Sequence, residues 1–231
     1  MSISYPAGYH TRRELMSQPE VWAAVVDQVA GREGELAAFL AAGQYTHAVF
    51  TGCGSPYYLA LSAALVFQGL TGLPALARPA SEIWLAPGDL PRMEGRGLLV
   101  VSSRSGETTE SVRAADTFHR AGRGDVFYIG CYPGRSMEAV SDYTLILPEA
   151  QEESTAQTRA FSAMYLATTA LALVAANRSS DLEALRRLPP VGRRLLDEYG
   201  DLALAVGADL ELDRFYFLGS RALYGLASEL S

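Results

Sequence analysis

The sequence predicts an α/β protein built on a doubly wound parallel sheet that helices flank on both faces, in a three-layer αβα arrangement. Two observations carry this prediction. Short continuous runs of apolar and β-branched residues recur along the chain, as in parallel strands that are buried on both faces. Helical stretches separate these runs, so each can serve as the crossover that a parallel pair of strands needs. An internal repeat near residue 213 indicates the start of a second tandem copy.

The predicted elements begin with helices and continue into the sheet. Between residues 11 and 42, apolar side chains recur at steps of three and four residues, which indicates helix. The strands and helices of the α/β unit follow within residues 43–150. Strands are predicted at His47–Thr51, Leu98–Ser102, Val126–Cys131 and Tyr143–Leu147, with a further one within Ala75–Ala86, and helices at Tyr57–Gly69 and Thr108–His119.

A long apolar helix is predicted after the last strand. Ser154 is followed three residues later by Gln157, which fits a capping box, and Ala160–Ala176 continues as an almost wholly apolar helix. Its most apolar part, Ala163–Ala176, contains two threonines and is shorter than the ~20 residues that cross a bilayer. A buried core helix is therefore expected, and no membrane partner.

A second helix is predicted at Asp181–Tyr199. It carries two pairs of opposite charge at four-residue spacing, Glu183 with Arg187 and Arg193 with Asp197. Such pairs are typical of a solvated helix face, so no binding patch is predicted there.

The segment that begins at Asp213 resembles the segment that begins at Thr46, at a constant offset of 167 residues. We interpret it as the strand, glycine loop and helix that open a second α/β unit, with the strand at Phe215–Leu218; chance similarity between two strand-to-helix turns is the alternative. The matching residues are Phe50, Gly52, Tyr57, Leu59 and Ala60 against Phe217, Gly219, Tyr224, Leu226 and Ala227. The predicted organisation is a helical segment (1–42), an α/β domain (43–178), a linker helix (179–212) and the beginning of a second, truncated domain (213–231).

Composition excludes several classes of function. The 231 residues carry 19 basic and 26 acidic side chains, a net charge of -7, so nucleic acid is not an expected partner. No residue is lysine, which rules out Schiff-base chemistry on a side-chain amine by this chain alone. Cys53 and Cys131 form neither a disulfide framework nor a metal-ligand pattern, and the three histidines give no zinc motif. We therefore expect a cytoplasmic protein without metal or cofactor.

Two strand-to-helix loops stand out, GCGSPY at 52–57 and SRSGETT at 103–109. Ligands of open parallel sheets bind at the carboxyl ends of the strands, and helix N-termini there suit a phosphate group. Glycines allow close approach of the backbone, and small hydroxyl side chains add donors. The alternative is that the serines and threonines only cap helices; two such loops on one sheet favour phosphate binding. The hydroxyls concerned are Ser55, Ser103, Ser105 and Thr108.

Other motifs give weaker signals. Tyr57 stands where a dinucleotide-binding loop needs its third glycine, and neither GxxxxGK[ST] nor GxSxG occurs. Cys53 follows a strand and precedes a helix, which would suit an activated thiolate. A small buried packing residue is the favoured reading of Cys53.

The motifs GCGSPYYLA, SRSGETTES and EESTAQTRAFS, in this order and spacing, resemble the SIS (sugar isomerase) domain family. They are most similar to the isomerase half of glucosamine-6-phosphate synthase and to its stand-alone phosphosugar isomerase and deaminase relatives, over roughly residues 11–231. The resemblance implies a homodimer, tandem domains and a sugar phosphate ligand of the fructose-6-phosphate or glucosamine-6-phosphate class. It also implies the residues that hold this ligand: Ser103, Arg104, Ser105 and Thr108 on the phosphate, Gly54 and Ser55 in the turn beside it, and Thr155 to Gln157 along the sugar.

The sequence departs from the family pattern at three places. Pro56 stands where the family usually has a second hydroxyl in the first loop, and Arg159 stands where it usually has lysine. The glutamate that serves the family as isomerase base falls beyond Ser231, and Glu229 matches an acidic position in the same helix but not the base itself. None of Glu107, Glu110, Glu152 and Glu153 has a motif that would replace it, so the catalytic residues are unknown. Two functions stay open: a phosphosugar isomerase or aminotransferase-like enzyme without a glutaminase domain, and a non-catalytic sugar-phosphate-binding module.

Overall fold

The computed structural model describes residues 5–90 and 93–231 and contains one five-stranded parallel sheet. The strand order is β2-β1-β3-β4-β5, and every neighbouring pair is parallel. The predicted fold class and all five predicted strands are confirmed. The strands are β1 (Tyr45–Gly52), β2 (Ala75–Pro79), β3 (Arg96–Ser102), β4 (Gly124–Gly130) and β5 (Tyr143–Ile146).

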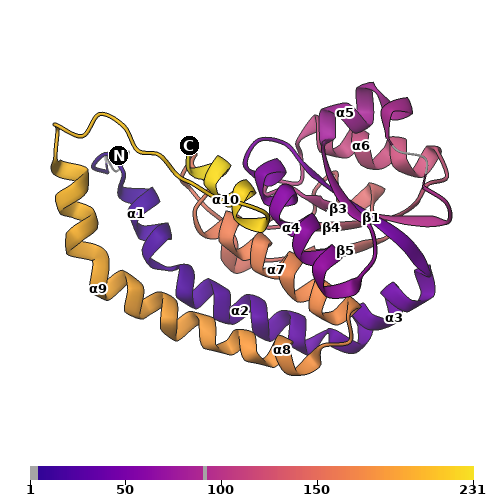
Figure 1. Ribbon diagram of the computed structural model, residues 1–231, viewed down its shortest axis with the longest axis horizontal. Coiled ribbons are helices and arrows are strands. Elements are labelled where there is room, and N and C mark those ends of the chain that lie inside the picture. The colour runs from indigo at the N-terminus through magenta and orange to yellow at the C-terminus, as the bar shows by residue number, and fades with distance from the viewer. Residues whose placement is uncertain (1–4, 91–92) are drawn as a thin grey trace.

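Helices cover both faces of the sheet, so two separate cores form (Figure 1). Neighbouring residues of a strand point to opposite faces. Phe50 of β1 therefore lies in the core beneath α2 (Gln18–Gly31), α4 (Ser55–Thr71) and α7 (Arg159–Ala175). The adjacent Val49 lies in the core beneath the helices of the other face. Those helices are α5 (Ala80–Leu85) and α6 (Thr109–Arg120), and the remaining N-terminal helices are α1 (Tyr9–Met16) and α3 (Glu33–Gly43).

The start of α7 differs from the predicted capping box. The N-cap residue is Thr158, and its side chain makes no capping hydrogen bond. Ser154 lies in the preceding loop, where its hydroxyl is 2.7 Å from the hydroxyl of Thr11. The Glu152 carboxylate caps the helix instead, because it accepts the N–H groups of Thr158 at 2.7 Å and Ala160 at 3.2 Å. A carboxylate six residues before the N-cap replaces the expected serine because the loop folds back on itself.

The helical region after the sheet also pairs differently from the prediction. It consists of α8 (Ser179–Ala184) and α9 (Leu188–Ala208), with α9 alongside α2 in Figure 1. Arg193 pairs with Glu20 of α2, and Glu183 pairs with Arg186. The predicted pairs Glu183–Arg187 and Arg193–Asp197 are wrong, since Arg186 at three-residue spacing takes Glu183 and the contact with α2 brings Glu20 to Arg193.

The last segment does not form the predicted strand at Phe215–Leu218. That stretch is extended and pairs with no strand among the described residues, since none lies beside it. The chain then turns into α10 (Ala222–Leu230), which packs against α4 (Figure 1). Among the described residues, no helix combines the length and apolar character needed to cross a membrane.

The backbone supports the internal repeat in spite of the missing strand. Gly54, before α4, has φ 64° and ψ -131°, and Arg221, before α10 and 167 residues later, has φ 55° and ψ -128°. A Cβ on Gly52 would lie 2.5 Å from Pro56, and a Cβ on Gly219 would lie 2.1 Å from the carbonyl oxygen of Leu223, the residue that corresponds to Pro56. The loop at 219–223 therefore repeats the tight turn at 52–56, although its N-cap residue is Arg221 where the first turn has Gly54.

Candidate functional site

The two glycine loops lie side by side because their strands are neighbours. The first loop follows β1, the second follows β3, and β1 pairs directly with β3. In the order β2-β1-β3-β4-β5, the chain winds toward one edge from β1 and toward the other edge from β3. Because the chain leaves β1 and β3 in opposite directions, the two neighbouring loops diverge and a crevice lies between them at the carboxyl ends of the strands. Ligands of doubly wound sheets bind in such a crevice.

A small pocket of about 100 Å³ occupies this crevice. Five of the predicted site residues line it, namely Ser103, Arg104, Ser105, Thr108 and Gln157. The other predicted residues do not: the Ser55 hydroxyl bonds to Glu229, Thr155 lines a separate depression beside α1, and Gly54 lies at the turn. The remaining lining residues are Cys53, Pro56, Ser102 and Ser111.

The hydroxyl groups of the pocket are not used as helix caps. Thr108 is the N-cap of α6, yet its side chain makes no capping hydrogen bond. Ser103 and Ser111 are 2% and 0% exposed, and their hydroxyl oxygens have no hydrogen-bond partner among the described residues. The Oε1 atom of Gln157 is buried without a partner as well. A buried polar atom without a partner is costly, so three such atoms in one pocket point to a bound polar ligand. The capping alternative therefore does not explain these side chains.

The backbone of the second loop is held mainly by backbone hydrogen bonds, to which Ser105 adds one contact, since its hydroxyl accepts the Glu107 N–H at 3.2 Å. The Ser103 N–H donates to Ile129, the Cys131 N–H donates to Arg104, and the Met137 N–H donates to Gly106, at 3.0–3.1 Å. Gly106 has φ +67°, and a Cβ on it would lie 2.4 Å from the hydroxyl of Tyr128. The loop is thus rigid, while the Ser103 hydroxyl has no partner among the described residues and the Ser105 hydroxyl can still donate its proton.

Arg104 braces a neighbouring loop as well as lining the pocket. Its Nη1 atom donates to the carbonyls of Ser154 at 3.1 Å and Thr155 at 3.3 Å, and lies 3.4 Å from the Glu152 carboxylate. All these contacts use Nη1, so Nε and Nη2 have no partner within the described part of the chain. The guanidinium can therefore hold the loop and still face an anion.

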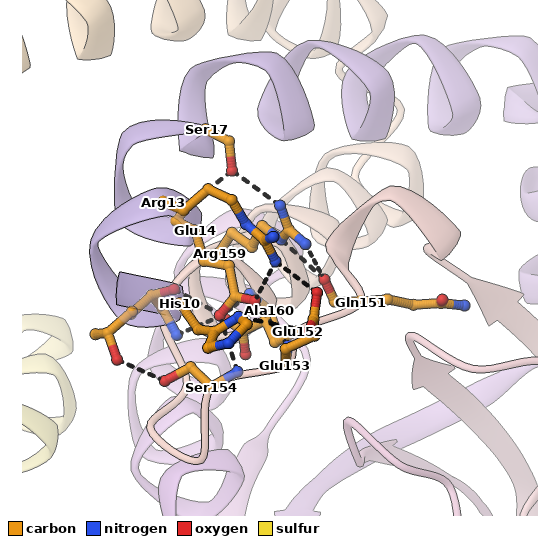
Figure 2. Close-up of polar contacts among 12 residues, drawn as sticks. His10, Arg13, Glu14, Ser17, Gln151, Glu152, Glu153, Ser154, Arg159 and Ala160 are labelled. Carbon is orange, nitrogen blue, oxygen red and sulfur yellow. Dashed lines mark hydrogen bonds and ion pairs between the residues drawn. The ribbon is translucent and has the colours of Figure 1, made fainter. Parts of the chain in front are cut away.

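Two buried carboxylates fold the loop that leads into α7 (Figure 2). Glu14 of α1 accepts the N–H groups of Glu153 at 2.7 Å and Ser154 at 3.2 Å. Glu152 caps α7. Arg159 donates from Nε to the carbonyl of Gln151 at 2.9 Å and from Nη1 to the hydroxyl of Ser17, between α1 and α2, at 3.0 Å. Arg159, which departs from the family pattern, thus holds the loop in this chain. The network places Gln157 in the pocket.

The carboxylates near the loops differ in their surroundings. Glu107 accepts the backbone N–H and the hydroxyl of Ser136, which lowers its pKa. Glu153 is exposed and pairs with Arg13, which lowers its pKa too. Partial burial raises the pKa of Glu229, beside Ser55.

Cys53 fits neither sequence-based reading. Its side chain is exposed, so the favoured prediction of a buried packing residue is wrong. Partial desolvation and the nearby Glu110 raise the pKa of its thiol above the ordinary 9.0, which disfavours an activated thiolate. The tight turn made by Gly52 and Pro56 turns this side chain outward at the pocket wall. Among the described residues, no group of three or more His, Cys, Asp or Glu side chains is placed to hold a metal ion.

Ser111 is the site residue that sequence reasoning missed. It begins the buried stripe of α6, which continues with Ala114, Ala115 and Phe118. A serine among apolar residues at this spacing, one turn after the SRSGETT loop, was the available signal. From the sequence alone, Ser111 is indistinguishable from a core position, and only the tertiary structure shows that it lines the pocket.

Residues 44–174 match the SIS domain family model. This chain belongs to the SIS domain family. Its relatives include the glutamine–fructose-6-phosphate aminotransferases (isomerizing) of Chlamydia muridarum, 26% identical over 96% of this chain, and of Bacillus subtilis, 26% identical over 76%. The chain spans 38% and 29% of the length of these two relatives.

Solved structures share the SIS fold over nearly the whole chain. Tagatose-6-phosphate ketose/aldose isomerase from Escherichia coli superposes with a TM-score of 0.83 over 98% of this chain and 65% of its own, at 23% identity. The C-terminal domain of glucosamine-fructose-6-phosphate aminotransferase from Francisella tularensis gives 0.81 over 98% of this chain and 67% of its own, at 22% identity. Glucosamine-6-phosphate deaminase from Thermotoga maritima gives 0.71 over 89% and 64%, at 27% identity.

Proposed function

We propose that this SIS domain binds a hexose or hexosamine 6-phosphate, of the fructose-6-phosphate or glucosamine-6-phosphate class, with the phosphate in the pocket between the two loops. The observation that carries the proposal is the set of three buried polar atoms without partners, on Ser103, Ser111 and Gln157. The relatives named for fructose-6-phosphate and tagatose-6-phosphate support the same ligand class.

The size of the pocket supports phosphate as the group that enters it. Pockets that enclose a whole small molecule measure roughly 300–1,000 Å³, whereas this one measures about 100 Å³. That volume suits a tetrahedral oxyanion, and the sugar would extend outward past Arg104 and Gln157. The pocket lies at the N-terminal end of α6, whose first-turn N–H groups lack partners within the helix and favour negative charge.

Calorimetry tests the binding proposal. Fructose-6-phosphate and glucosamine-6-phosphate are titrated into the chain beside fructose and glucosamine, and we expect binding of the phosphorylated sugars only. Ser103→Ala and Ser105→Ala should each weaken binding by roughly tenfold without unfolding the chain, because each removes a charge-assisted hydrogen bond. Equal affinity for both sets of sugars, or none for either, would contradict a phosphate site.

For the reaction class, we propose an isomerase or aminotransferase-like role in amino-sugar phosphate metabolism, in which a proton moves between C1 and C2 of the sugar. Such chemistry needs a general base near C1 and C2. Glu107 and Glu153 are held by donors that lower their pKa, and Glu152 is occupied by the N-terminus of α7. These contacts favour the second candidate, a SIS module that binds the sugar phosphate without turning it over.

Exchange of solvent deuterium into C1 of fructose-6-phosphate, the carbon that gives up the proton in this chemistry, separates the two candidates. Exchange at an enzymatic rate by the 231-residue chain supports the isomerase class and makes Glu229→Gln, Glu152→Gln and Glu153→Gln the first variants to compare. Tight binding of the sugar phosphate with no exchange supports the binding module.

A further inference from the structure

We infer that Ser111 is a phosphate-binding residue of this pocket, a third hydroxyl donor contributed by α6 beside those of the second loop. The inference rests on the proposed function, since it names one more group that would hold the same ligand. It starts from the position of Ser111 in the third residue of α6, at the pocket wall.

The burial of Ser111 is the first line of support. The side chain is 0% exposed, and its hydroxyl has no hydrogen-bond partner among the described residues. Serine in a helix usually bonds back to a carbonyl of the preceding turn, which satisfies it internally. A serine that does neither, on a stripe otherwise made of Ala114, Ala115 and Phe118, destabilises the free protein.

The neighbours of Ser111 show what kind of ligand would satisfy it. The Ser103 hydroxyl is equally buried and without a partner, and it lines the same pocket. Arg104 brings a guanidinium with unused donors to the wall, and α6 brings the positive end of its dipole. Hydroxyl and N–H donors around a space of about 100 Å³ match a tetrahedral oxyanion.

The first loop explains why α6 would supply the donor. Pro56, at the second position of α4, lines the pocket and has neither a hydroxyl nor an N–H group. Pro56 thus offers no hydrogen-bond donor to an anion, and the hydroxyl donors of this pocket come from the second loop and α6 on the other side. Ser111 is the buried hydroxyl on α6 that faces this space.

The test compares two equally buried helix serines, of which one hydroxyl has a hydrogen-bond partner among the described residues and the other has none. Ser62 of α4 is 0% exposed like Ser111, but its hydroxyl donates to the carbonyl of Ala222 at 2.6 Å and lies outside the pocket. Ser111→Ala and Ser62→Ala are made in the full chain. Thermal unfolding of the free protein and calorimetry with fructose-6-phosphate and with inorganic phosphate are measured for each.

We expect the two variants to move in opposite directions. Ser111→Ala should keep or raise the unfolding midpoint of the free protein, because it removes a buried group without a partner, and weaken both phosphate ligands by roughly tenfold or more. Ser62→Ala should lower the midpoint and leave the affinities unchanged.

Three results overturn the inference. If the unaltered chain binds and Ser111→Ala binds equally well, Ser111 is not a ligand and the proposed function stands. If Ser111→Ala loses stability and affinity together, its role is structural. If the unaltered chain binds neither phosphate ligand, the proposed function fails and this inference fails with it.

Discussion

In the second loop, Gly106 determines the path of the backbone, and Ser103 and Ser105 supply hydroxyl groups to the pocket. Gly106 fixes the backbone, since it has φ +67° and no room for a Cβ beside Tyr128 and Arg135. The Ser103 hydroxyl has no partner among the described residues, and the Ser105 hydroxyl accepts the Glu107 N–H but can still donate its own proton, because backbone hydrogen bonds hold most of the loop. A rigid frame with unused donors is a preorganised site, which binds an anion without a further cost of ordering side chains and loop.

Replacement of Gly106 by alanine tests the rigid frame. We expect Gly106→Ala to destabilise the fold by about 2 kcal/mol or more, because a left-handed backbone and a steric clash act together, and to abolish sugar phosphate binding. Gly134→Ala is the matched control: Gly134 has φ +70°, but a Cβ there meets no atom within 4 Å. It should cost only about 1–2 kcal/mol. Equal losses of stability in urea for the two variants would contradict the close packing at Gly106.

The thiol of Cys53 reports on occupancy of the pocket. Partial burial raises the pKa of this thiol above the ordinary 9.0, so little thiolate forms near neutral pH, and alkylation by iodoacetamide should rise with pH toward a midpoint above that of an ordinary thiol. Fructose-6-phosphate should slow the reaction, because Cys53 lines the pocket. Cys131 is 0% exposed, and burial raises the pKa of its thiol to about 12, so it should react only in the unfolded chain. Peptide mass spectrometry checks both sites; a midpoint near neutral pH, or no protection, would disprove this reading.

At the scale of elements, the loop before α7 depends on Glu152. Its carboxylate accepts two hydrogen bonds from Thr158 and one from the Ala160 N–H, and it faces Arg104. Arg104 and Gln157 both line the pocket, so the shape of the pocket depends on the same Glu152 contacts that cap α7.

Glu152→Gln should therefore weaken stability and binding together. All three of these donors converge on Oε1 while Oε2 faces Arg104, so the amide keeps them only by turning its NH₂ group toward the Arg104 guanidinium. We expect a loss of about 2–3 kcal/mol in the free energy of unfolding. Glu153→Gln is the control, because the adjacent side chain is 64% exposed and its ion pair with Arg13 is worth less than about 1 kcal/mol. Denaturant titration of both variants checks this; similar losses would show that Glu152 is not the cap on which the loop depends.

A second feature at this scale is the contact between α4 and α10. Ser62 bonds to the carbonyl of Ala222, and Ser55 bonds to Glu229. With the offset of 167 residues, Ala222 corresponds to Ser55 and Glu229 corresponds to Ser62. Gly225, which corresponds to Tyr58, would place a Cβ 2.3 Å from the carbonyl oxygen of Tyr58. The two copies therefore meet in a reciprocal, near two-fold manner, the pattern of a self-complementary interface. This geometry favours a true repeat over chance similarity.

On the scale of the whole molecule, the extended segment before α10 leaves a large apolar surface exposed. Phe215, Tyr216 and Leu218 are 56%, 79% and 93% exposed, and Leu210 is 96% exposed. Monomers rarely expose contiguous apolar patches of more than a few hundred Å². Because α10 packs on α4 of its own chain, residues 210–218 are the part of the C-terminal segment that stays uncovered.

We expect the chain to form a homodimer in which residues 210–218 are covered by the second copy. Light scattering of the full chain should give the mass of a dimer, and a version that ends at Gly207 should give a monomer. Val49→Ala, a core change on the far face of the sheet, serves as the control for general destabilisation and should keep the dimer. A monomeric full chain, or an unchanged mass after the truncation, would remove this segment as the cause of association.

Much of this protein followed from sequence alone, because its signals are local. Continuous apolar runs gave the five strands, three- and four-residue periodicity gave the helices, and the two glycine loops gave the site at the strand ends. Ser103, Ser105 and Thr108 were predictable since loop chemistry is written in neighbouring residues. The resemblance to the SIS family predicted a ligand contact for Gln157, which the structure places at the wall of the same pocket.

Only the tertiary structure decided the contacts between distant residues. Glu14 of the N-terminal helix α1 holds a loop that Glu152 caps from within, Arg193 pairs with Glu20 of α2 and not with its own helix, and Phe215–Leu218 pairs with no strand among the described residues. Ser111 looked like a core position until β1 and β3 became neighbours and placed a pocket against it. The reason is physical: a strand needs a partner strand, and a polar group needs a partner atom. Which partner is nearest depends on the packing of segments that lie more than a hundred residues apart.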